Sequence, residues 1–174
     1  MKSSIPAKLF GLLIALTFAT PLRAQAPAGS VSALAVSALA VSAENRTALA
    51  AAARGAKRAD ASVHAGDVLR YKLTFTNTAG RPVRQVAIQN PVATGLQFVA
   101  GSAQSSRQDA RAEYSADNGA SWSARPMETV LIDGKRIDRA IAAERYTSVR
   151  WMVDGWVPPG ATVTAQFEAR LATR

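Results

Sequence analysis

The sequence of 174 residues contains no cysteine and a single histidine, His64. Without cysteine there is no disulfide, no thiol nucleophile and no lipid-modified cysteine. One histidine cannot supply a zinc site built on several imidazoles, and no Ser-His-Asp arrangement or Gly-x-Ser-x-Gly motif accompanies it. A lone histidine beside a turn at 65–66 is typical of a solvated loop residue. We therefore predict no catalytic residue, no metal site and no cofactor, and a protein that is not an enzyme.

Acidic side chains offer another route to catalysis, because two carboxylates about 5 to 10 Å apart suffice for glycoside hydrolysis. Three acids lie close together in the sequence, at Asp133, Asp138 and Glu144. Basic residues alternate with them, at Lys135, Arg136, Arg139 and Arg145. This pattern indicates a charged surface loop over 133–145 with weak ion pairs rather than a catalytic pair.

The first 26 residues have the three parts of a secretory signal. Lys2 and Lys8 form the basic start, residues 9–19 are apolar, and small residues follow. That run is shorter than the roughly 20 residues that span a bilayer. We expect a cleavable signal peptide over 1–26, cut after Ala26, with Ala24 or Ala28 as fallback sites because a proline follows Ala26; an uncleaved anchor is the alternative. The protein is then exported to the periplasm or the cell surface of a Gram-negative bacterium, with no transmembrane segment after signal cleavage.

Acidic residues are few, 12 against 21 basic ones, which gives a net charge of +9. Loss of the signal removes three basic residues and leaves +6. The basic residues are scattered in small groups without a basic and aromatic stripe, which argues against nucleic acid as a partner. We expect an unknown envelope protein or glycan instead, and an acidic polysaccharide or lipid head group suits the charge.

Long amphipathic helices are also lacking, and the chain shows the shorter alternation of strands. A five-residue repeat, Val-Ser-Ala-Leu-Ala, occupies 31–43. It predicts a low-complexity tether over 27–35 and a first strand over 39–45. In the Ala-rich segment that follows, a short helix is the alternative, but Gly55 and the charges after it favour a strand or hairpin that fades into a loop.

Period-two alternation is plain over 68–76, where Leu69, Tyr71, Leu73 and Phe75 share one face. Further extended runs, separated by turn residues, lie at 83–91, 95–102, 110–123, 146–156 and 161–171. Short strands with turns between them predict a single domain over 36–174, an all-β antiparallel β-sandwich.

The stretch Ser-Ala-Asp-Asn-Gly-Ala-Ser-Trp at 115–122 has the spacing of the Asp-box hairpin of sialidase-type propellers. A propeller needs four or more blades of roughly 40 to 50 residues, so one copy in this chain excludes it. We predict a structural hairpin made by Ser115, Asp117, Gly119 and Trp122. Asp117 would accept backbone N–H bonds, Gly119 would take a positive φ, and Trp122 would cover the base. A carbohydrate-contacting loop with Trp122 exposed is the alternative.

Two of the three tryptophans are candidates for partner contact. Trp151 shares a face with Val149 and Val153, which predicts that it points into the core. Trp156 lies beside a glycine and a pair of prolines, and so at a loop. Trp122 and Trp156 are therefore the possible partner contacts.

The segment 65–103 resembles the conserved-repeat domain family, also called domain of unknown function eleven, a module of bacterial exported and surface proteins. The signature of that family has a Gly-Asp turn, a strand with tyrosine, an Asn-Thr-Gly turn, a loop proline and a Gly-Leu-x-Phe-Val-x-Gly-Ser strand. The matching residues are Gly66, Asp67, Tyr71, Asn77, Pro91, Gly95, Leu96, Phe98, Val99, Gly101 and Ser102. Weaker likeness extends over about 36–171. Ala65 and Asn90 depart from the pattern and weaken a cation site at that loop.

The resemblance implies an immunoglobulin-like fold and supplies no catalytic residue. We expect a non-catalytic exported structural or binding module of the cell envelope. It would present loops such as 104–112, 117–120 and 133–145, or an edge strand, to a protein or glycan partner. A carbohydrate-binding or carbohydrate-active domain that uses the Asp-box hairpin and Trp122 is one alternative, and an accessory subunit of a surface assembly is another.

Overall fold

The computed structural model describes residues 30–32, 37–56 and 62–173. The predicted signal peptide over 1–26 lies outside the described residues. Antiparallel strands account for most of the regular structure in the described part, as predicted. In chain order the elements are β1 (Ser30–Ser32), β2 (Ser37–Asn45), α1 (Arg46–Ala53), β3 (Val68–Asn77), β4 (Val86–Pro91), β5 (Leu96–Phe98), β6 (Gln104–Ser105), β7 (Ala110–Ser115), β8 (Met127–Ile132), β9 (Lys135–Ala140), the 3-10 helix η1 (Ala143–Arg145), β10 (Ser148–Val153) and β11 (Thr162–Leu171).

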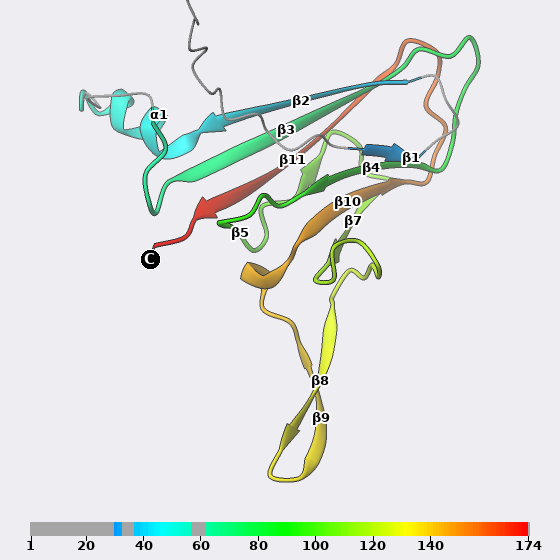
Figure 1. The fold of residues 1–174 in the computed structure, drawn as a ribbon. Coiled ribbons are helices and arrows are strands. Elements are labelled where there is room, and N and C mark those ends of the chain that lie inside the picture. The colour runs from blue at the N-terminus through cyan, green and yellow to red at the C-terminus, as the bar shows by residue number, and fades with distance from the viewer. Residues whose placement is uncertain (1–29, 33–36, 57–61, 174) are drawn as a thin grey trace, which may run out of the picture.

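Two sheets form the body of the protein (Figure 1). One has the strand order β1-β4-β10-β7, and the other has the order β2-β3-β11-β5, with β6 also paired to β11. Apolar side chains of both sheets meet in one core, because each strand turns alternate residues inward. The largest fully buried side chains include those of Phe75, Ile88, Trp151 and Phe167.

Strand β3 shows how the sequence pattern becomes a sheet with one buried face. Tyr71, Leu73 and Phe75 are buried, whereas Lys72 on the opposite face is exposed, as the alternation predicted. The turn that follows is held by Asn77, whose buried amide group donates to the carbonyl oxygens of Arg81 and Val157 at 3.0 and 2.9 Å. A fully buried asparagine at this position therefore joins the end of β3 to the β10–β11 connection.

The aromatic side chains gather around β11. The Phe167 ring lies 5.0 Å from that of Tyr71, 5.9 Å from that of Phe98 and 6.3 Å from that of Trp151, measured between centroids. Trp151 is buried, which confirms its predicted inward orientation. Aromatic packing of this kind contributes much of the energy of a core.

Two sequence-based expectations near the amino terminus differ from the structure. Residues Ser30–Ser32, predicted to lie in a tether, form β1, because backbone pairing with β4 does not depend on side-chain periodicity. The Ala-rich segment forms helix α1 instead of a strand or hairpin. The Asn45 side chain accepts a hydrogen bond from the Ala48 N–H at 2.9 Å and caps the helix, and Gly55 with φ +78° ends it.

The run predicted over 83–91 is broken in the structure. Gln85 has a φ of +55°, so regular pairing in β4 begins only at Val86. Val83 still pairs across a single bridge with Val157. The break lies at the end of the connection from β3 to β4, where the chain passes from the β2-β3-β11-β5 sheet to the β1-β4-β10-β7 sheet.

Strands β8 and β9 form a separate two-stranded sheet, which we call the arm (residues 127–140). It projects away from the two-sheet body (Figure 1). The prediction of a loop over 133–145 was wrong here, because Asp133 and Gly134 adopt φ values of +49° and +75° and close a two-residue hairpin turn. The loop predicted over 104–112 is likewise interrupted by β6 and the start of β7.

Candidate binding surface

The Asp-box segment is a compact loop at the end of β7, closed by one bridge between Tyr114 and Ser123. The buried Ser115 hydroxyl donates to the Asp117 carboxylate at 2.6 Å and accepts from the Gly119 N–H at 2.8 Å. Asp117 also accepts from the backbone N–H and the hydroxyl of Ser121, at 2.9 and 2.5 Å. Every one of these bonds stays within the loop.

Those donors also determine the charge state of the carboxylate. The hydrogen bond from the Ser115 hydroxyl, followed by those from Ser121, lowers the pKa of Asp117 from 3.8 to about 2. The loop backbone is shaped for the same turn, with φ +58° at Asn118 and +89° at Gly119. The Asp117 carboxylate is therefore ionised and engaged in hydrogen bonds that stabilise the loop. With so low a pKa it is not suited to accept a proton at neutral pH.

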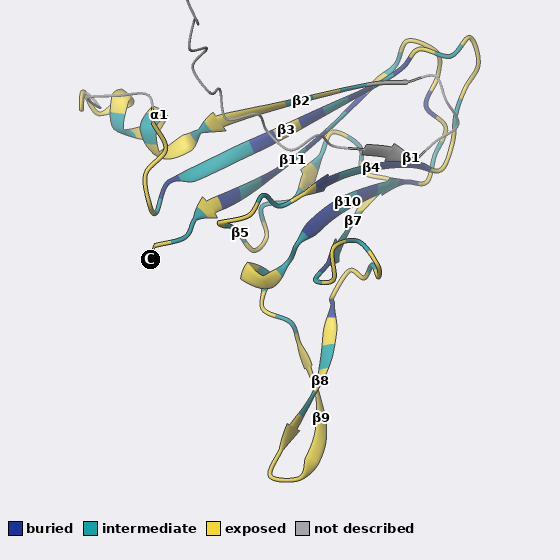
Figure 2. Cartoon of the chain, viewed as in Figure 1, coloured by how far each residue is buried: buried dark blue, intermediate teal, exposed yellow. Residues whose placement is uncertain are grey.

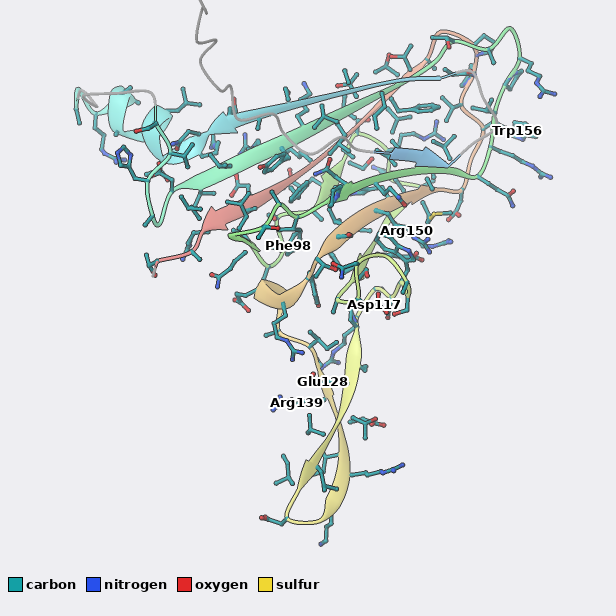
Figure 3. The ribbon with its side chains drawn as sticks, in the orientation of Figure 1. Phe98, Asp117, Glu128, Arg139, Arg150 and Trp156 are labelled. Carbon is teal, nitrogen blue, oxygen red and sulfur yellow. The ribbon has the colours of Figure 1, made fainter. Side chains whose placement is uncertain are left out.

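Trp122 lies half-buried above the outer face of the β1-β4-β10-β7 sheet. The Arg150 guanidinium stands 4.5 Å from the centre of its ring, in cation–π contact. Arg150 is itself held by Glu113, with nitrogen–oxygen distances of 2.6 and 2.8 Å. One face of the Trp122 ring is thus covered by a fixed arginine, and Figure 3 shows Arg150 near Asp117 on this side of the body.

Trp156 lies at a different end of the body, in the connection from β10 to β11 (Figure 3). Its side chain is 58% exposed, and the Arg84 guanidinium lies 5.4 Å from its ring centre. Arg107 donates to the Trp156 carbonyl oxygen at 3.1 Å and pairs with Asp109. Trp122 and Trp156 belong to separate surfaces, so the two predicted contacts do not form one site.

Asp109 fixes the backbone that carries Trp156. It accepts from the Gly155 N–H at 3.0 Å, and a side chain at position 155 would collide with its carboxylate. The Arg107 guanidinium, by hydrogen bonding, lowers the pKa of Asp109 from 3.8 to about 2. Trp156 is therefore exposed on a connection whose position is well determined.

The arm is the feature of the surface that the sequence analysis missed. Large apolar side chains are exposed on it, namely Met127, Leu131, Ile132 and Ile137. Leu131 is 70% exposed, the highest value among the exposed large hydrophobic side chains of the described residues. Figure 2 shows exposed residues along nearly the whole arm, in contrast to the buried strands of the body. The Asp-Gly dipeptide at 133–134, a strong signal for a two-residue hairpin turn, could have revealed it.

The base of the arm is held by ion pairs. Glu128 accepts from Arg139 at 2.9 Å and from Arg145 at 2.7 Å, so β8 is tied both to β9 and to η1 (Figure 3). These two arginines lower the pKa of Glu128. Further out, the Thr129 hydroxyl donates to Asp138 at 2.6 Å. The polar contacts order the hairpin and leave its apolar side chains uncovered.

The acids considered as a catalytic pair have separate roles. Asp133 forms the arm turn, Asp138 accepts from Thr129, and Glu144 lies in η1. His64 is exposed, with its Nε2 3.4 Å from the Ser62 hydroxyl. Among the described residues, no cluster of three or more His, Cys, Asp or Glu side chains could hold a metal ion.

A wide depression lies on the outer face of the β2-β3-β11-β5 sheet. Its volume is about 410 Å³, and its lining is Ser42, Ala43, Glu44, Arg70, Lys72 and Gln166. Arg70 pairs with Glu168 at 2.9 Å and with Glu44 at 3.5 Å. The charges of this depression are mostly paired with each other, so it is a polar surface rather than an organised site.

No family model, curated protein or solved structure matches this chain. In the described part of the chain, no helix has the length and apolar character needed to cross a membrane.

Proposed function

We propose that this protein is a non-catalytic structural or binding module of the bacterial cell envelope, exported through its amino-terminal signal. Its body would be an immunoglobulin-like β-sandwich of the conserved-repeat type. The two antiparallel sheets around one core are consistent with that architecture. Four of the signature residues lie at turns or in the core: Gly66 and Gly95 have φ values of +85° and +86°, and Tyr71 and Phe98 are buried.

The feature that best supports a binding role is the arm, with its exposed apolar side chains. An isolated two-stranded hairpin is at best marginally stable in water, and exposed apolar side chains on it gain nothing unless something covers them. Leu131, Ile132 and Ile137 stand on such a hairpin, well away from the core. A surface of this kind is typical of contact with another molecule, and we infer that the arm is the main contact element.

Sedimentation with isolated envelope fractions tests this role. We expect the purified mature protein to sediment with the fractions, and the double change Leu131→Ser and Ile132→Ser to reduce the bound fraction at least tenfold. Leu49→Ser is the matched control, because Leu49 is also an exposed leucine but lies on α1 of the body. Equal binding of the two variants, or no binding of the unmodified protein, would contradict the proposal.

Carbohydrate binding is the second candidate, and the exposed ring of Trp156 favours it. A tryptophan that is 58% exposed on a fixed connection can stack on a sugar ring. The Trp122 ring is less suited, because it is only half-exposed and its arginine lies closer, with Arg150 at 4.5 Å from the ring centre against 5.4 Å for Arg84 over Trp156. A glycan array separates the candidates: loss of a sugar signal on Trp156→Ala with unchanged melting would support this function, and an array without signal would exclude it for the sugars displayed.

A further inference from the structure

The two edges of the arm differ sharply in charge. On β9, Lys135, Arg136, Asp138 and Arg139 make four of its six residues charged. On β8 the only charged residue is Glu128, which is engaged by Arg139 and Arg145 at the base of the arm. Charged side chains protect an edge strand from pairing with another strand. The edge of β8 over residues 129–132 lacks that protection.

The backbone groups along the β8 edge can be assigned from the ladder. The Ile141 N–H donates to the Pro126 carbonyl oxygen at 2.9 Å, and hydrogen-bonded pairs alternate with non-hydrogen-bonded pairs in an antiparallel ladder. The even-numbered residues of β8 therefore bond to β9, and the odd-numbered residues, Met127, Thr129 and Leu131, direct their N–H and C=O groups outward. Within the described residues, β8 pairs with β9 alone.

We propose that the β8 edge pairs antiparallel with the β8 edge of a second copy of this chain, around a two-fold axis at Val130. This inference rests on the proposed binding role of the arm and names the partner of its open edge. In this register Thr129 lies opposite Leu131 of the second copy, and the outward groups of the odd-numbered residues bond to each other. Glu128 lies opposite Ile132 of the second copy, so no like charges face each other.

The same symmetry joins the apolar side chains of the two arms. Val130 and Ile137 are cross-strand partners, and Ile132 is two residues from Val130, so all three lie on one face of the arm. A two-fold axis perpendicular to the sheet keeps that face on the same side in both copies. The three side chains of each copy then form one continuous apolar strip on a four-stranded sheet, which is far more stable than a single hairpin.

The absence of like-charge pairs favours the β8–β8 pairing over a symmetric β9–β9 pairing. If β9 paired with itself, a register centred on Asp138 would place Asp138 against Asp138 of the second copy. A register centred on Ile137 would place Lys135 against Arg139, although it would also place Arg136 against Asp138. Like charges directly opposite each other destabilise a sheet. The β8 register therefore contains no like-charge pair, whereas each of these two β9 registers contains at least one. The body does not obstruct the pairing, because the arm projects clear of it.

A single introduced cysteine tests the register, since the natural chain has none. Across the axis, Val130 of one copy lies opposite Val130 of the other as a non-hydrogen-bonded pair. Their Cα atoms are then about 4.5 Å apart, within the range that a disulfide bridges. We expect Val130→Cys to form a dimer disulfide with copper–phenanthroline. Ile137→Cys is the control, because three strand spacings, about 14 Å, separate its two copies and prevent a bond. Equal cross-linking at both positions, or none at Val130→Cys, would overturn the register.

Proline substitutions test the edge without relying on cross-linking. Thr129→Pro and Asp138→Pro both remove the hydrogen bond between the two side chains. Each also removes one outward N–H group, on the β8 edge for Thr129→Pro and on the β9 edge for Asp138→Pro. In sedimentation equilibrium we expect a dimer for the unmodified protein and for Asp138→Pro, and at least tenfold weaker association for Thr129→Pro. Near-ultraviolet circular dichroism verifies that the body is folded in each variant.

A monomer at 100 micromolar, or equal effects of the two prolines, would overturn the inference.

Failure of the pairing and failure of the proposed function give different results. A monomer that still needs Leu131 and Ile132 to sediment with envelope fractions refutes the pairing and leaves the proposed function. A dimer that does not bind the fractions refutes the proposed function and leaves the pairing.

Discussion

At the scale of single residues, Phe167 lies at a junction of the aromatic core. Its ring meets those of Tyr71, Phe98 and Trp151, which come from three different strands. No disulfide reinforces the body, so stability depends on this packing. An aromatic side chain at such a junction joins the two sheets.

We therefore expect Phe167→Ala to lower the free energy of unfolding by about 3–5 kcal/mol, through lost burial and a cavity. Urea denaturation followed by fluorescence measures the change. Trp156→Ala is the control, because that side chain is exposed, and it should cost less than about 1 kcal/mol. A loss below about 1 kcal/mol for Phe167→Ala would mean that the core packs differently.

The contribution of Asp117 to the stability of the folded protein should depend on pH. Its pKa is about 2 in the folded protein and 3.8 in an ordinary setting, so the ionised carboxylate stabilises the folded state above about pH 4. That contribution is lost as the pH falls through the folded pKa. We expect Asp117→Asn to melt at a lower temperature than the unmodified protein at pH 7, and the difference to shrink between pH 4 and pH 2. Melting curves across this range test it, and a difference independent of pH would contradict it.

The Asp-box residues show what a local pattern can and cannot predict. The sequence spacing was enough to predict the turn, because Ser115, Asp117 and Gly119 interact within a few residues of each other. It could not predict that Arg150, far along the chain, covers Trp122. Contacts between distant segments depend on which strands become neighbours, and one sequence does not specify that order.

At the scale of elements, helix α1 depends on the residue that caps its start, Asn45. Asn45 caps the helix by accepting from the Ala48 N–H, and its amide nitrogen donates to the buried Asp67 carboxylate at 2.8 Å. None of the helical residues is buried, so packing adds little to its stability. One side chain thus both starts the helix and attaches it to the turn before β3.

Asn45→Ala should lower the free energy of unfolding by about 1–3 kcal/mol, because it removes a helix cap and one donor to a buried carboxylate. Urea denaturation followed by far-ultraviolet circular dichroism measures it. Arg46→Ala is the control, since the Arg46 pairs with Glu44 and Glu168 are long and partly exposed, and it should cost less than about 1 kcal/mol. Equal losses in the two variants would show that the cap is not the cause.

The predictions for helix α1 and for the arm were wrong for the same physical reason. In the Ala-rich segment, the prediction gave more weight to Gly55 and the nearby charges than to the helix propensity of alanine. In the structure that glycine only ends the helix. In the arm, the charges of β9 suggested a loop, although Asp133 and Gly134 form the turn of a hairpin. Strands that bury one face, such as β3, were predictable because burial imposes alternation; the arm buries neither face and lacks that signal.

At the scale of the whole molecule, the body and the arm are distinct structural units. The body holds the core, to which Tyr146 and Ala143 still contribute just after the arm. No residue of 127–140 takes part in that core. The arm begins and ends at neighbouring points, since the Ile141 N–H donates to the Pro126 carbonyl oxygen. The fold therefore places the core in the body and leaves the arm, the proposed contact element, outside it.

Replacement of residues 127–140 by Asn-Gly should leave the body intact. The two-residue turn can join Pro126 to Ile141, whose backbones are already hydrogen-bonded, and the main loss is the exposed pairing of Arg145 with Glu128. We expect one cooperative transition in differential scanning calorimetry, with a melting temperature within about 5 °C of the unmodified protein. A broad transition, or a fall well beyond that range, would show that the arm stabilises the body and that contact and stability are not separated.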